Sequence, residues 1–63
     1  MKYKYQVDFE DIKVGADFEK NGNAYIKQSS RTARITRPVE YSGKWFYFGS
    51  LEKINIAGSA LNR

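Results

Sequence analysis

The chain has 63 residues and a formal net charge of +4, and it contains neither cysteine nor histidine. Disulfides, structural zinc and haem attachment are therefore excluded, and the side chains most often used in acid–base or nucleophilic catalysis are missing. No apolar run approaches the ~20 residues that span a bilayer, and no apolar signal segment follows the first lysines. We expect a small, non-enzymatic, cytoplasmic domain without a cofactor or a membrane partner.

Residues 1–9 alternate between apolar and polar side chains, which is typical of a half-buried strand. The apolar set on the core side would be Tyr3, Tyr5, Val7 and Phe9. The intervening lysines suit an edge strand, where charge hinders pairing with other chains. A connection follows, in which we expect Phe9, Ile12 and Val14 to pack on the core. Gly15 is expected at positive φ before the next strand.

Asn21-Gly22 predicts a tight hairpin, because both central residues of a type I′ turn need positive φ. With this pair as the loop, Phe18 faces Tyr25 and the two rings form a favourable cross-strand pair. A loop at Gly22-Asn23 would place Phe18 opposite Lys27 and break the apolar face. The first register is the one we expect.

Three further strands are predicted along the rest of the chain. Residues 32–36 form a strand with Ala33 and Ile35 inward, and Pro38 either ends it or confines its end to a sheet edge. Residues 44–48 have no polar face, so we expect both faces of that strand to be covered. Residues 51–56 form the last strand, with Ile54 and Ile56 inward.

The pattern amounts to five or six short strands separated by turn signals, without helical periodicity. We expect an all-β fold, with a small SH3-like barrel as the first choice and a curved antiparallel meander sheet or an OB-like barrel as the alternative. Residues 1–57 would form the single domain. Residues 58–63 would be a flexible C-terminal tail, in which Leu61 could dock on the domain.

The segment Phe9-Glu10-Asp11-Ile12-Lys13-Val14-Gly15-Ala16-Asp17-Phe18, then Asn21-Gly22-Asn23 and Tyr25-Ile26-Lys27, resembles a pattern in small proteins of tailed bacteriophages. Those proteins show a Phe-x-Asp-Leu-x-x-Gly-x-x-Phe motif, an Asn-Gly turn, an aromatic residue and a lysine. Two later segments also fit these proteins, Ser29-Ser30-Arg31-Thr32-Ala33 and Phe46-Tyr47-Phe48-Gly49, so the resemblance covers residues 9–49. It implies a phage-encoded protein that works in the host cytoplasm, and it implies no mechanism.

The region from Lys20 to Val39 has no acidic residue, whereas acids crowd the segment 8–19. Arginine, lysine and hydroxyl side chains in one stretch are the mixture that binds phosphate. The predicted contact residues in this stretch are Lys27, Ser29, Arg31, Thr32, Arg34 and Arg37. The alternative is that these residues form the solvated outer face of a basic strand.

Tyr41, Trp45 and Tyr47 form the second candidate set. Alternation places Trp45 and Tyr47 on one face of their strand, where they could stack on bases or contact a protein. The interpretation that we favour is that the N-terminal strand, with Tyr3 and Tyr5, covers them, because a small domain needs apolar burial.

The carboxylates of Asp8, Glu10 and Asp11 lack the glycine-punctuated spacing of a calcium loop, so no metal site is expected. The preferred function is nucleic-acid binding through the basic strand face and the aromatic platform. The alternative is a phage protein that binds and inhibits or redirects an acidic host protein, using Trp45 and the segment 8–19. A homo-oligomeric component is a third possibility.

Overall fold

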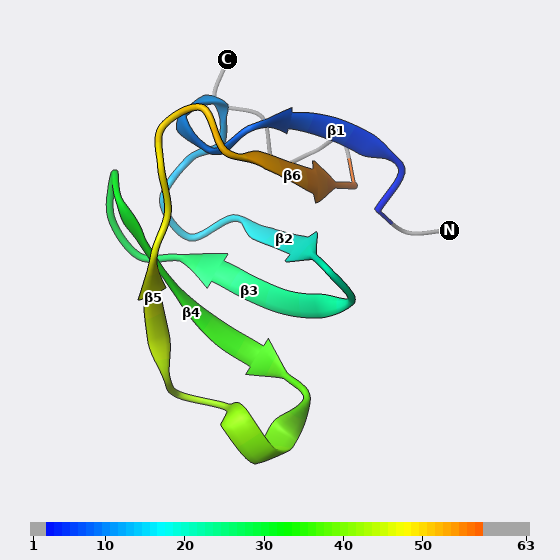
Figure 1. Cartoon of the computed structure of the whole chain (residues 1–63), viewed down its shortest axis with the longest axis vertical. Helices are drawn as coiled ribbons and strands as arrows, with labels where there is room; N and C mark the ends of the chain where they lie inside the picture. The colour runs from blue at the N-terminus through cyan, green and yellow to red at the C-terminus, as the bar shows by residue number, and fades with distance from the viewer. Residues whose placement is uncertain (1–2, 58–63) are drawn as a thin grey trace.

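The computed structural model describes residues 3–57, which form six antiparallel strands in one curved sheet (Figure 1). Two single 3-10 turns, η1 and η2, interrupt the strands. The elements in chain order are β1 (Tyr5–Asp8), η1 (Phe9–Asp11), β2 (Asp17–Lys20), β3 (Asn23–Lys27), β4 (Thr32–Arg37), η2 (Val39–Tyr41), β5 (Trp45–Tyr47) and β6 (Lys53–Ile56). The all-β prediction is confirmed. No helix in this part of the chain is long and apolar enough to cross a membrane.

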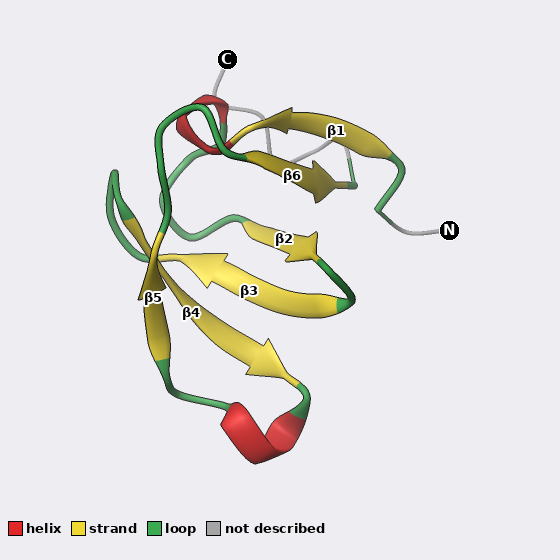
Figure 2. Ribbon diagram, viewed as in Figure 1, coloured by secondary structure: helices red, strands yellow, loops and turns green. Residues whose placement is uncertain are grey.

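The strands lie in the order β1-β6-β2-β3-β4-β5 (Figure 2). Strands β2 to β5 follow one another as a meander, and β6 returns across the molecule to lie between β1 and β2. Within the described residues β1 and β5 are the edges and do not pair with each other. The expected barrel therefore does not close, and the alternative of a curved open sheet is the one observed.

The hairpin between β2 and β3 has the predicted register. Phe18 lies opposite Tyr25, and their rings stack with centroids 5.3 Å apart. Asn21 and Gly22 adopt φ values of 54° and 85°, as a type I′ turn requires. The turn residues and the cross-strand aromatic pair thus agree on one register.

The core lies on one side of the sheet, called here the inner face. Phe9, Phe18, Ile12, Ile54 and Ile56 are its largest fully buried side chains. Phe48 joins them from the loop after β5 and stacks on Phe9 at 5.0 Å. The predicted inward residues of β4 and β6 are all buried there: Ala33, Ile35, Ile54 and Ile56.

The connection between β1 and β2 is anchored as predicted at Phe9 and Ile12, but not at Val14, which is 60% exposed. Gly15 turns the chain at φ 94°, and its N–H donates to the Lys27 carbonyl oxygen. This turn directs Ala16 into the core in place of Val14. The positive φ expected at Gly15 is confirmed.

The first strand is an edge strand, as its lysines indicated. Its alternation is weaker than predicted, because Tyr5 is 52% exposed and Val7 is only partly buried. Strand β1 pairs with β6 alone, so the sheet covers it from one side only. The predicted tail and the docking of Leu61 lie outside the described residues.

Candidate functional site

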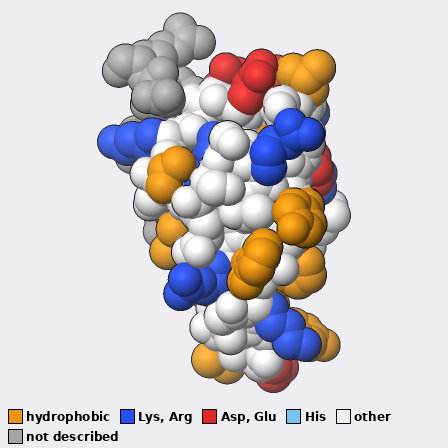
Figure 3. All heavy atoms as spheres, turned by 90° about the vertical axis from the view of Figure 1, so that its left-hand side faces the viewer, with side chains coloured by type: hydrophobic (Ala, Val, Ile, Leu, Met, Phe, Trp, Pro, Cys, Tyr) orange, Lys and Arg blue, Asp and Glu red, His pale blue; other side chains and the backbone are white. Residues whose placement is uncertain are grey.

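Strand β5 presents two aromatic rings to solvent. Trp45 is 57% exposed and Tyr47 is 79% exposed. They face Arg34 and Thr32 across the β4–β5 pairing, whereas Phe46 faces the buried Ala33. Trp45 and Tyr47 therefore point from the outer face of the sheet, opposite the core. Figure 3 shows apolar side chains next to Lys and Arg side chains on the side of the molecule where β5 lies.

The expected covering of this strand is wrong on both counts. Strand β1, with Tyr5, lies at the opposite edge of the sheet from β5. Phe46 is also 42% exposed, although its ring contacts that of Tyr25 edge-on with centroids 6.0 Å apart. The sheet does not close, so only Phe48 of this aromatic run reaches the core.

Polar and basic residues lie on β4 and in the β3–β4 turn, next to strand β5. Arg34 and Arg31 are exposed, the first on β4 and the second in the β3–β4 turn. The hydroxyls of Ser29 and Thr32 share a hydrogen bond of 2.7 Å across that turn. The Arg31 backbone N–H donates to Ser29 Oγ at 3.3 Å. We call this set the β4–β5 face: Ser29, Arg31, Thr32, Arg34, Trp45 and Tyr47.

Lys27 does not belong to this face. Its side chain points inward beside Tyr25, and the residue is 5% exposed. The ammonium donates hydrogen bonds to the Phe9 and Ile12 carbonyl oxygens, at 3.0 and 2.7 Å. Burial lowers the pKa of Lys27, while the nearby Glu10 and Asp11 raise it. The prediction that Lys27 contacts a ligand is therefore corrected, and its two-residue spacing from Tyr25 was the signal for its inward direction.

Arg37 and Tyr41 lie apart from the two rings. Strict alternation would turn Arg37 inward, but a bulge opposite Ala24 and Tyr25 shifts the register at the end of β4. The Arg37 guanidinium consequently reaches the outer face, where it donates to the Tyr3 hydroxyl at 3.4 Å. Tyr41 is in η2, with the Lys44 ammonium 5.6 Å from its ring centroid.

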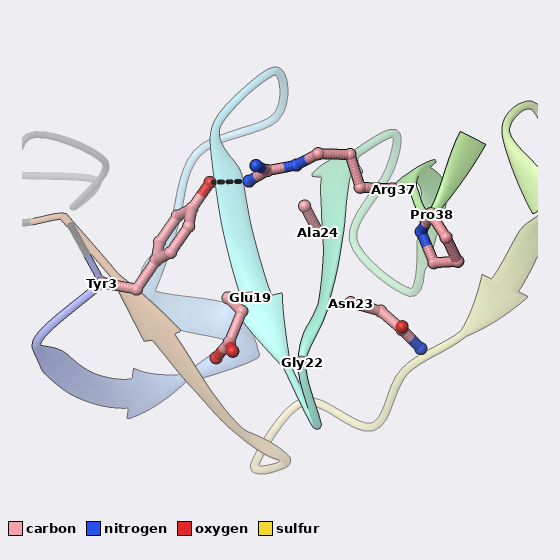
Figure 4. Close-up of a pocket in the computed structure, with 7 residues that line it drawn as sticks. All are labelled: Tyr3, Glu19, Gly22, Asn23, Ala24, Arg37 and Pro38. Atoms are coloured by element: carbon pink, nitrogen blue, oxygen red, sulfur yellow. Dashed lines mark hydrogen bonds between the residues drawn. The ribbon is translucent and has the colours of Figure 1, made fainter. Parts of the chain in front are cut away.

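A groove of about 460 Å³ opens on the outer face beside Arg37. Figure 4 shows Tyr3 and Glu19 on one side of it, Asn23 and Pro38 on the other, and Arg37 reaching over Ala24 towards Tyr3. The Tyr3 hydroxyl also donates to Asp17 Oδ2 at 2.6 Å. Burial and the Asp17 carboxylate raise the pKa of Tyr3. No local sequence pattern signals this groove, because its residues meet only when β2, β3 and β4 pair and Tyr3, which precedes β1, comes to lie beside them.

Among residues 3–57, no group of three or more Asp or Glu side chains is placed to hold a metal ion. Asp8 forms an ion pair with Lys53, and Glu52 pairs with Lys20 at 2.9 Å. Part of the acidic charge is thus neutralised between neighbouring strands.

No family model, curated protein or solved structure matches the chain. The resemblance to small tailed-phage proteins therefore stays a prediction.

Proposed function

We propose that this protein binds single-stranded nucleic acid on its β4–β5 face. The observation that supports this best is the pair of exposed rings, Trp45 and Tyr47, on the outer face of an edge strand next to Arg34. Exposed aromatic rings beside cationic side chains are the usual means by which small β-sheet domains bind bases and phosphates together.

The arrangement of the rings favours an unpaired strand. Their planes are inclined at 66° with centroids 5.8 Å apart, so they do not form one flat platform. Each ring offers a face to a separate base, and bases reach such faces only when they are unstacked. A flexible single strand meets this condition, and a duplex does not.

The phosphates would lie over β4 and the β3–β4 turn. Arg34 and Arg31 supply positive charge there, and the paired hydroxyls of Ser29 and Thr32 supply neutral hydrogen-bonding groups. Arg34 is held loosely in place by a 3.3 Å hydrogen bond to Gln28 Oε1. Phosphate contacts of this type position the strand without reading its sequence.

Trp45 is the only tryptophan, so its fluorescence reports directly on this face. We expect oligothymidylate and oligouridylate to quench it and to raise the anisotropy of a labelled strand. The affinity should fall steeply between about 50 and 200 mM salt. If both the Trp45 fluorescence and the anisotropy of the labelled strand stay unchanged at low salt, the proposal is contradicted.

The variants Trp45→Ala and Tyr47→Ala should each weaken binding by about 1–3 kcal/mol per stacked base. Leu51→Ala is the matched control, because Leu51 is 68% exposed but lies in the loop between β5 and β6. Its affinity should equal that of the wild type. An equal decrease in all three variants would indicate a general defect and would count against a specific aromatic contact.

A second function, binding of an acidic protein, has its own supporting observation. The Phe48 N–H donates to Arg31 O and the Ile35 N–H donates to Lys44 O. In an antiparallel pair, the residues whose N–H and C=O groups point to the partner strand alternate with residues whose groups point away. Because Lys44 and Phe48 bond to β4, the backbone groups of Trp45 and Tyr47 point away from it. An extended acidic segment of a partner, such as a host protein, could pair with that edge. The acidic segment 8–19 would contribute less, because β3 and β4 separate β2 from β5.

A further inference from the structure

We propose that the groove beside Arg37 binds one unpaired guanine base of the same strand. This inference rests on the proposed function and adds a sequence preference to it. The groove differs from the β4–β5 face in its chemistry, because a carboxylate, an amide and a guanidinium line it together with the phenol ring of Tyr3, and no indole ring lines it.

The groove and the β4–β5 face lie on the same side of the sheet. Trp45 is opposite Arg34, and Arg34 is opposite Ile26 on the next strand. Two residues further along β3, Ala24 forms the floor of the groove. Strands β5 and β3 are two inter-strand spacings apart, about 10 Å. A flexible strand that stacks on Trp45 therefore has only a short path to the groove.

Glu19 is the residue that selects the base. Its Oε1 accepts a hydrogen bond from Asn55 Nδ2 at 3.0 Å, which orients the carboxylate. Oε2 has no hydrogen-bond partner among the described residues. An ionised carboxylate only accepts hydrogen bonds, so it suits a base edge with adjacent donors. Guanine presents such an edge, N1–H next to the N2 amino group, and the other common bases do not.

The Arg37 guanidinium is available to the same nucleotide, because it reaches to the side of the groove where Glu19 lies (Figure 4). The Arg37 guanidinium uses one of its N–H groups on Tyr3, which leaves others for guanine O6 or for a phosphate.

The distribution of charge on this face determines which strand the phosphate lies over and which strand the base edge contacts. Acids lie on β2, at Asp17 and Glu19, and arginines lie on β4, at Arg34 and Arg37. Phosphates are drawn to β4 and repelled from β2, whereas the donor edge of guanine is attracted to β2. A free phosphate in the groove is disfavoured for the same reason, because Glu19 would repel it.

The test compares oligothymidylate with the same strand carrying one central guanosine. We expect the guanosine strand to bind at least about fivefold more tightly, as a bidentate base contact provides. Inosine, which lacks the N2 amino group, should give an intermediate affinity. Glu19→Gln should remove the preference and change the affinity for oligothymidylate no more than the same loss of charge elsewhere on the surface does. Glu10→Gln is the control with the same charge change, since Glu10 is exposed in η1 and outside the groove; it should keep the preference.

A second measurement separates this inference from the proposed function. Guanosine 5′-monophosphate should shift the backbone amide signals of Gly22 and Asn23 in the Trp45→Ala variant, and adenosine 5′-monophosphate should not. Shifts without any binding of oligothymidylate would support the groove and refute the stacking face. Equal affinities for the two strands, with no shifts by the guanine nucleotide, would overturn the groove and leave the stacking face intact.

Discussion

The Lys27 ammonium lies 4.5 Å from the centroid of the Phe9 ring and donates a 3.0 Å hydrogen bond to the Phe9 carbonyl oxygen. One buried cation therefore contacts both the side chain and the backbone of the same core residue. A third contact, to the Ile12 carbonyl oxygen, ties β3 to the far end of the η1 turn. In a chain without disulfides, this lysine fastens the connection between β1 and β2 to the sheet.

Lys27→Met should lower the free energy of unfolding by about 1–3 kcal/mol, because two buried carbonyl oxygens are deprived of their charged donor. Methionine has a similar length and fills the space of the aliphatic chain, so the change isolates the ammonium group. Urea unfolding followed by Trp45 fluorescence measures it. Lys13→Met, at an exposed neighbouring position, should leave the midpoint where it was.

The lowered pKa of Lys27 gives a pH dependence of definite sign. Between that pKa and the ordinary value of 10.5, the unfolded chain binds more protons at this site than the folded one. Stability from this group therefore rises with pH across the window. The tyrosines titrate in the same range, so the quantity to measure is the difference between wild type and Lys27→Met. We expect this difference to grow towards pH 10.5 in favour of the wild type, and a constant difference would contradict the shift.

Gly22→Val should cost about 1 kcal/mol or more, because a β-branched residue is strained at φ 85°. No atom lies within 4 Å of the added Cβ, so the cost comes from the backbone and not from a clash. Thermal unfolding measures it. Gly49→Val is the matched control, since Gly49 also has open space around its Cβ but no positive φ. A similar melting temperature for Gly22→Val and the wild type would refute the turn assignment.

The parts of the fold that sequence predicted correctly depend on neighbours in the chain. The Asn21-Gly22 turn determines its own conformation, and it places Phe18 opposite Tyr25 without help from the rest of the molecule. Alternation in β4 and β6 likewise placed Ala33, Ile35, Ile54 and Ile56 in the core.

Most of the failures depend on how strands pair with one another. The fold is a barrel if β1 pairs with β5 and an open sheet if it does not. No residue pattern within either strand predicts whether they pair. That choice then decides whether Trp45 is covered. The bulge that turns Arg37 outward, and the groove that it borders, arise from the pairing of β3 with β4. Lys27 was misassigned because basic side chains are usually exposed, although its spacing from Tyr25 pointed inward.

Addition of EDTA should leave the thermal unfolding midpoint unchanged. The carboxylates of Asp8 and Glu52 pair with lysines on neighbouring strands, which leaves them poorly suited as metal ligands. Differential scanning fluorimetry with and without the chelator measures this. A lower midpoint that Mg²⁺ or Ca²⁺ restores would reveal a metal site that the sequence pattern did not predict.

The double variant Arg31→Gln/Arg34→Gln should weaken nucleic-acid binding and flatten its salt dependence by about one unit for each phosphate interaction removed. Both side chains are exposed, so folding measured by circular dichroism should survive. Lys4→Gln/Lys13→Gln removes the same charge from exposed positions outside the β4–β5 face and should keep the wild-type slope. If the partner is an acidic protein, the arginine pair should slow mainly association. If both double variants change binding equally, net charge explains the effect and the β4–β5 face has no special role.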